Sequence, residues 1–404
     1  MIKSLHKYFF YLAVFALPIN LGLHFVFNWS YLNGLLVDYL LPVIYVQDIL
    51  VLLTLLSWLL TVKKEDLINL FNHKITPLVV LFVASIAFSI INSSLINISI
   101  YLFLKSSLYA LFFFYIISTF DIKRDFVLFS KVLAVSVFLV CLLAVGQWVN
   151  QGSVFNNYLF FGEQPYSFST YGVIRENLLG QTKIPVYGTF RHPNTFAGFL
   201  VITLFLLLGL VPEKKFNTAV FGLGSLVLLF TFSYFAVSVF VIGFAFIYFI
   251  KKWGRSGYLF SLFIVLVIST GLLFLPYIRS YNTSISRRSD LLSAVYSSIS
   301  RNILVGTGVG TAVISAPDLN FVQPVHNVFV LLLKEGGITL VMLFGGIIWV
   351  CALTAFYYKK PLFFVVLLQI VLLSSFDHYF WTMQQTQLLF WLTCGIVCTY
   401  NLRQ

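Results

Sequence analysis

The chain has 404 residues, of which 60% are hydrophobic and only 9% are charged, and its mean hydropathy is +0.96. Average soluble proteins carry roughly 25% charged residues, so this chain lacks the polar side chains that a soluble fold needs on its surface. The formal net charge of +12 does not indicate a nucleic-acid partner, because the Lys and Arg residues stand at the ends of apolar segments. The composition predicts an all-α, polytopic membrane protein, with residues 1–404 forming one membrane domain.

Hydropathy divides the chain into about twelve membrane spans, because a helix needs ~20 apolar residues to cross a bilayer core of ~30 Å. One stretch, residues 216–250, has no charged residue and would be about 52 Å long as a single helix. We therefore expect it to fold back near Ser233-Tyr234 into two short spans. The predicted spans are residues 8–27, 42–62, 76–92, 99–119, 131–150, 193–211, 217–233, 234–250, 257–276, 337–357, 361–376 and 382–401.

The distribution of positive charge predicts the orientation of these spans. Cytoplasmic loops are enriched in Lys and Arg, and this rule places both termini in the cytoplasm. Two long segments, residues 151–192 and 277–325, then lie on the outer side, where we expect them to contain short interfacial helices. Loops longer than about 12–15 residues are usually functional or disordered, so these segments are the places to seek a site.

The first candidate constellation is Gly188-Thr-Phe-Arg-His-Pro-Asn194, at the outer end of the sixth predicted span. Pro193 can occupy the first turn of a helix, which places Arg191 and His192 where a helix N-terminus meets solvent. Backbone N–H groups and a guanidinium suit a phosphate group there. We therefore take Arg191, His192 and Asn194 as candidate substrate-binding residues, the alternative being an interfacial arginine that extends to lipid headgroups.

The second constellation is Ser286-Arg-Arg-Ser-Asp290, which is followed by apolar residues at helical spacing. This pattern predicts a short amphipathic helix on the outer membrane surface, with Ser286 as its N-cap. Arg287 and Arg288 stand near its start, where the helix dipole disfavours cations, so a bound anion would complete the site; the alternative is a solvated charged face. The glycine-rich stretch 306–310 can cradle a phosphate, but a flexible turn is favoured because no strand precedes it.

Two further motifs contain histidine. Pro324-Val-His326-Asn327 opens an apolar helix, whose positive end favours a neutral imidazole that can act as a base. The alternative is a histidine that hydrogen-bonds a backbone carbonyl at an interface. Asp377-His378 lies between the final two spans and is a candidate substrate-binding pair, although a mutually satisfied loop pair explains it equally well. No metal-binding motif occurs in the sequence, and neither a metal ion nor a cofactor is expected.

Taken together, these motifs resemble the O-antigen ligase and polymerase superfamily of bacterial membrane glycan transferases, over roughly residues 185–400. The residues that carry the resemblance are Gly-Thr-Phe-Arg-His-Pro-Asn-Thr-Phe-Ala-Gly (188–198), Arg288 ahead of Gly306-Thr-Gly308, and His326-Asn327 with Glu335-Gly-Gly-Ile338.

The resemblance implies an enzyme that transfers a glycan from an undecaprenyl-diphosphate carrier to an acceptor hydroxyl, without a metal ion. The transfer would take place on the outer face of the bacterial cytoplasmic membrane. Arg288 would match the family's diphosphate-binding arginine and His326 its catalytic histidine, with Asn327 beside it. Many members carry Ser-Arg where this chain has Ser233-Tyr234, so a second cation would have to come from Arg191 or Arg287.

The expected partners are the carrier-linked glycan donor, a lipid or glycan acceptor, and membrane lipids. A ligase, which uses a lipid or protein acceptor, and a polymerase, which uses another carrier-linked glycan, share this machinery and are not separated by the sequence. A transporter of the same lipid is the alternative outside the enzymes. It is disfavoured because the spans show no repeat and few charges.

Overall fold

The computed structural model of the chain describes residues 4–209, 214–277, 283–299, 303–315 and 322–402. Helices account for 72% of the structure and strands for 4%. Apolar helices dominate because a backbone in hydrocarbon must satisfy its own hydrogen bonds. The expected class, an all-α membrane protein, agrees with this content.

Five helices in the described residues are long and apolar enough to cross a membrane, and a sixth span arises if α2 and α3, bent by 117°, are counted together. Four more apolar helices are shorter. A 17-residue helix rises about 26 Å, less than the ~30 Å core. The five are α5 (Ile96–Thr119), α6 (Ile122–Asn150), α9 (Tyr234–Trp253), α10 (Arg255–Leu273) and α12 (Val328–Tyr357). The bent pair is α2 (Val46–Leu59) and α3 (Lys64–Phe71), and the shorter helices are α4 (Thr76–Ser89), α7 (Pro193–Gly209), α8 (Lys214–Phe230) and α13 (Pro361–Phe376).

The structure therefore does not show about twelve full spans. Hydropathy counts apolar residues whether or not they are helical, and several apolar stretches include other structure. The stretch 76–92, for example, ends in the 3₁₀ turn η4 (Ile90–Asn92), and the stretch 42–62 begins with the strand β4 (Val43–Tyr45). The predicted reversal near Ser233-Tyr234 is confirmed, since α8 ends at Phe230 and α9 begins at Tyr234.

The N-terminal segment departs furthest from the prediction of a span over residues 8–27. Helix α1 (Leu5–Phe15) ends early, and β1 (Gly22–His24) pairs antiparallel with β4. Pro18 has no amide hydrogen for a continuing helix, and the chain after it leaves the helical path. A second small hairpin, β2 (Tyr31–Leu32) with β3 (Leu35–Leu36), precedes the turn η3 (Asp38–Leu40).

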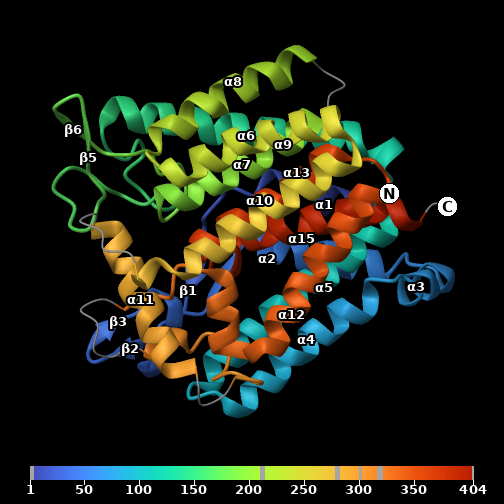
Figure 1. Cartoon of the computed structure of the whole chain (residues 1–404), viewed down its shortest axis with the longest axis horizontal. Coiled ribbons are helices and arrows are strands. Elements are labelled where there is room, and N and C mark those ends of the chain that lie inside the picture. Colours follow the sequence, from blue (N-terminus) through green and yellow to red (C-terminus); the bar gives the residue numbers. More distant parts are fainter. Residues whose placement is uncertain (1–3, 210–213, 278–282, 300–302, 316–321, 403–404) are drawn as a thin grey trace.

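The most buried helices lie in the middle of the bundle. Most residues of α7, α13 and α15 (Gln384–Cys398) are buried, and α13 packs against α7, α9, α10 and α12. Figure 1 shows both chain ends near α3 at one end of the bundle, whereas α11 and the small β-hairpins gather at the other end. The loops expected on the outer side thus lie opposite the two termini.

The first long segment, residues 151–192, contains no helix, which corrects the expectation of an interfacial helix there. Instead, β5 (Glu176–Leu178) and β6 (Gln181–Lys183) form a hairpin. Leu179 and Gly180 both have positive φ at its tip (50° and 83°), the backbone conformation that two-residue hairpin turns need.

The second long segment contains the predicted helix, although parts of 277–325 lie outside the described residues. Helix α11 (Thr283–Ile299) begins before Ser286, so Ser286 is not its N-cap. Its apolar residues Leu291, Leu292 and Val295 are buried, and Tyr296 donates its hydroxyl to the carbonyl of Leu273 in α10. The apolar face of the helix therefore packs on the protein.

Helix α12 is broken at Gly337 (φ 70°, ψ −175°). The glycine-rich stretch 306–310 supplies hydrogen bonds to backbone carbonyls beside this break. The N–H groups of Thr307 and Gly308 donate to the carbonyls of Lys334 and Glu335, at 3.0 and 2.9 Å. A Cβ on Gly337 would lie 2.3 Å from Leu304 backbone atoms, so only glycine permits this approach. These N–H groups are used inside the protein, so the stretch 306–310 does not form the phosphate cradle considered from the sequence.

Candidate active site

Asp377 occupies the turn between α13 and the one-turn helix α14 (Tyr379–Thr382), next to His378. Both residues are buried. The backbone N–H of His378 donates to Asp377 Oδ1 at 2.8 Å. A buried carboxylate needs charge or hydrogen bonds to replace water, and two side chains from other parts of the chain supply them.

His326 supplies the first, from just before α12. Its Nδ1 lies 3.1 Å from Asp377 Oδ1. Because a carboxylate only accepts hydrogen bonds, Nδ1 is a protonated nitrogen, and in the neutral ring Nε2 then carries the lone pair. The side chain of His326 is 16% exposed, against 5–9% for those of Arg288, Asp377 and His378. His326 is therefore the group that a substrate reaches most readily.

Arg288 of α11 supplies the second contact. Its guanidinium Nη2 lies 3.5 Å from Asp377 Oδ2, and Nη1 donates to the carbonyl and the hydroxyl of Ser284 one turn earlier. The guanidinium stands over the ring of Phe376, 4.4 Å from its centroid, an arrangement that stabilises a cation. Its Nε is buried without a partner. The arginine predicted to bind diphosphate is thus held in place with one donor unused.

Two further imidazoles complete the surroundings. His378 Nδ1 lies 2.6 Å from the Thr382 hydroxyl, and its ring centroid is 4.9 Å from that of His326. His192 Nδ1 accepts the backbone N–H of Asn194 at 3.1 Å. Burial lowers the pKa of His378 to about 3 and that of His192 to about 4, so both rings are neutral at pH 7.

We call Arg288, His326, Asp377 and His378 the His–Asp cluster. Burial acts to raise the pKa of Asp377, but the contacts with His326 and Arg288 hold that pKa well below its usual range. The cluster pairs one carboxylate with a guanidinium and two imidazoles. The unused Nε donor of Arg288 is the group in the cluster that suits an anionic substrate.

The other predicted site residues take different places. Asn327 caps α12 by accepting the N–H of Val330, and donates to the carbonyl of Ser375 at 2.8 Å, so its amide ties α12 to α13. Arg287 is exposed on α11, and Asn194 is half-buried at the start of α7. Tyr234, which stands where many members of the O-antigen ligase and polymerase superfamily carry Arg, is 69% exposed.

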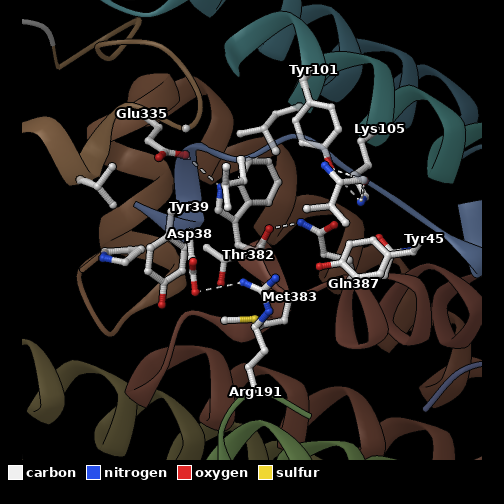
Figure 2. Close-up of a pocket in the computed structure, with 18 residues that line it drawn as sticks. Asp38, Tyr39, Tyr45, Tyr101, Lys105, Arg191, Glu335, Thr382, Met383 and Gln387 are labelled. Atoms are coloured by element: carbon white, nitrogen blue, oxygen red, sulfur yellow. Dashed lines mark hydrogen bonds and ion pairs between the residues drawn. The ribbon is translucent and has the colours of Figure 1, made fainter. Parts of the chain in front are cut away.

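Arg191 lies apart from Arg288, in a cavity of about 80 Å³ beside the cluster. Its guanidinium contacts His24 Nε2 at 2.9 Å and Asp38 Oδ2 at 3.4 Å. Figure 2 shows Arg191 directed toward Asp38, with Tyr39, Thr382 and Met383 close by. The ring of Tyr39 meets that of His378 edge-on, at 5.6 Å between centroids, so the cavity and the cluster adjoin.

Metal-ligating atoms of three cluster residues, His326, Asp377 and His378, lie within 4.8 Å of one another. Two imidazoles and a carboxylate are a donor set for d-block metals. The Arg288 guanidinium, however, already pairs with this carboxylate at 3.5 Å and would repel a divalent cation. The geometry favours a hydrogen-bonded dyad over a metal centre.

Sequence reasoning missed the contributions of the N-terminal segment and of Trp381. His24 and Asp38 fell inside or beside a predicted span, yet both contact Arg191. The indole of Trp381 donates to Glu335 at 3.0 Å and so links α14 to α12. The signal in the sequence was that these polar residues stand isolated in or beside apolar segments. A buried polar side chain needs a partner, so each of them indicates a contact with another part of the chain.

No family model matches the chain, and no curated protein is similar to it at a significant level. The assignment of function therefore rests on the residues and their geometry.

Proposed function

We propose that the protein transfers a glycan from an undecaprenyl-diphosphate carrier to an acceptor hydroxyl, as O-antigen ligases and polymerases do. The observation that supports this most is Asp377, which contacts His326 through one carboxylate oxygen and Arg288 through the other. One buried side chain thereby holds a base and a cation at a fixed separation.

In this reaction the acceptor oxygen attacks C1 of the first donor sugar, and the bond between C1 and the diphosphate oxygen breaks. His326 Nε2 takes the acceptor's proton. Asp377 accepts from Nδ1 and stabilises the imidazolium that forms, as a carboxylate does beside a catalytic histidine. Arg288 balances the charge that develops on the leaving undecaprenyl diphosphate.

Helix α11, which carries Arg288 of the cluster, lies at the bundle end opposite the two termini (Figure 1). This accords with a site on the outer face of a bacterial cytoplasmic membrane. The proposal places both termini in the cytoplasm and makes the protein a multi-pass enzyme that works without a metal ion. The short apolar helices α4, α7, α8 and α13 join the longer ones as further membrane segments. The acceptor is a lipid or a second glycan.

The test is transfer from a defined undecaprenyl-diphosphate oligosaccharide by the purified protein, with His326→Ala and His326→Gln. General base catalysis contributes roughly 10²–10⁴-fold, so both variants should lose turnover by that order while donor affinity stays within threefold. His73→Gln, a buried histidine between α3 and α4, is the control. Recovery of most activity in His326→Gln would show that the residue only braces its loop.

A further inference from the structure

The cavity beside the cluster is built from segments that are distant in the sequence. Among its walls are η3, β4, α5, Arg191 two residues before α7, and the α14–α15 region. Thr382 lines it and also contacts His378 at 2.6 Å, while Pro324 lines it two residues before His326. None of the four cluster residues lines the cavity itself. Tyr39 and Thr382, which do line it, both contact His378, so the cavity adjoins the cluster at that histidine.

Two polar atoms of cavity-lining residues are buried without a partner. Arg191 Nε is an unused donor and Gln384 Oε1 an unused acceptor, and Gln384 as a whole is 3% exposed. The other amide atom of Gln384, Nε2, donates to Asp48 at 3.0 Å, which fixes the side chain. Buried polar atoms are costly unless a ligand or water satisfies them. A hydroxyl group satisfies both kinds, since it donates and accepts.

The remaining lining is aromatic and amphipathic. Tyr39, Tyr45, Tyr101 and Trp381 line the cavity, and Figure 2 shows Tyr39 on one side with Tyr45 and Gln387 on the other. Such side chains present a flat apolar face together with a polar edge. The cavity volume of about 80 Å³ is several times the ~10–15 Å³ that one water needs. A ring with hydroxyls on its rim and C–H groups on its faces matches these walls.

The two cations at the cavity are already paired. Lys105 lies 3.3 Å from Asp48 and contacts the Tyr101 hydroxyl at 3.0 Å, and Arg191 contacts Asp38. Glu335 accepts from Trp381 at 3.0 Å. The polar atoms left unused are therefore Arg191 Nε, a donor, and Gln384 Oε1, an acceptor, and a hydroxyl group can satisfy both.

We infer that this cavity is the subsite for a sugar residue of the acceptor, which it holds with one hydroxyl toward His326. The inference rests on the proposed transfer and names the substrate class on its receiving side. The donor's diphosphate occupies the Arg288 side, and the acceptor sugar occupies the Arg191 and Gln384 side, with His326 between them. Acceptor specificity then resides in η3, β4 and α15.

Binding is measured first, without any donor. Saturation-transfer NMR on the detergent-solubilised full chain uses methyl glycosides of a hexose, an N-acetylhexosamine, a 6-deoxyhexose and a hexuronic acid. At least one should receive saturation from the wild type. The signal should fall at least fivefold in Gln384→Leu, which removes the acceptor atom, and in Met383→Phe, which fills the cavity. Gln385→Leu is the matched control, because Gln385 is equally buried but does not line the cavity.

Kinetics of transfer supply the second measurement. Gln384→Leu and Met383→Phe should raise KM for the acceptor tenfold or more, while KM for the donor stays within threefold. Melting temperatures close to that of Gln385→Leu exclude misfolding. If the wild type binds a glycoside but transfers no glycan, the proposed function is wrong and the sugar subsite stands. If the wild type transfers glycan but gives no glycoside signal, and both cavity variants keep the acceptor KM of the wild type, the cavity holds only water and the subsite is wrong.

Discussion

His326 Nδ1 lies 3.1 Å from Asp377 Oδ1, although 51 positions separate the two residues. Asn327 brings them together, because its side chain caps α12 and bonds to the end of α13. The caps of two neighbouring helices, Asn327 of α12 and Asp377 of α13, thus set the geometry of the His326–Asp377 pair. Changes at Asn327 should therefore act on the site through position rather than through chemistry.

Arg288→Lys should lose most transfer activity, by at least tenfold in kcat/KM. A lysine ammonium is a point charge and cannot reproduce the planar donor fork of a guanidinium, and it would not stack on Phe376 in the same way. Steady-state rates with varied donor check this. Arg255→Lys, at the exposed start of α10, is the control and should stay near wild type. If Arg288→Ala keeps activity within threefold of the wild type, a change below ~1 kcal/mol, Arg288 does not bind the diphosphate.

Acidification should destabilise the fold through His192. Its folded pKa is lowered to about 4 by burial, whereas the unfolded ring titrates near ~6.5. Between these values the unfolded chain binds more protons, so stability is complete above pH ~6.5 and falls as the pH drops toward 4. At pH 5 this amounts to about 2 kcal/mol.

The measurement is the melting temperature in detergent at pH 7.5 and pH 5, for the wild type and His192→Gln. The variant should show a smaller drop between the two pH values, because glutamine takes up no proton. His378, whose pKa is also lowered, should account for part of the drop that remains. An equal drop in the variant and the wild type would show that His192 is not buried in its neutral form.

Gly337→Ala should destabilise the protein, by about 1–3 kcal/mol or more. Gly337 has φ 70° and lies against the backbone of Leu304, where a Cβ would approach to 2.3 Å. Gly345→Ala is the matched control in the same helix. A Cβ there meets nothing within 4 Å, and alanine favours a helix by up to ~1 kcal/mol over glycine. Thermal unfolding of both variants decides; equal stabilities would contradict the broken-helix geometry.

The orientation of the protein in the membrane is tested with variants that each carry one introduced cysteine, which is labelled in whole cells. Ser297 of α11 and Glu65 of α3 are both exposed, and the two helices lie toward opposite ends of the bundle. An impermeant maleimide should label Ser297→Cys in intact cells and Glu65→Cys only after the membrane is opened. The four native cysteines are buried and should give little background. Labelling of both sites in intact cells would refute the proposed topology.

The sequence by itself determined the class of the protein and most helix positions. Composition excluded a soluble fold, and length alone placed the reversal at Ser233-Tyr234, because a charge-free helix over residues 216–250 would exceed the bilayer. Helical spacing of apolar residues predicted α11. Arg288, His326 and Asp377 stood out separately as polar residues in an apolar chain, and the structure places them in one cluster.

Only the tertiary structure decided which of these residues meet and where the backbone leaves the helical path. Periodicity reports neighbours within a turn or two, whereas Gly308 bonds to Glu335 and Arg191 meets His24 across long separations. These contacts arise because buried polar groups must find partners wherever the packed chain supplies them. The cavity beside His326 exists for the same reason, since its walls come from segments that no local pattern connects.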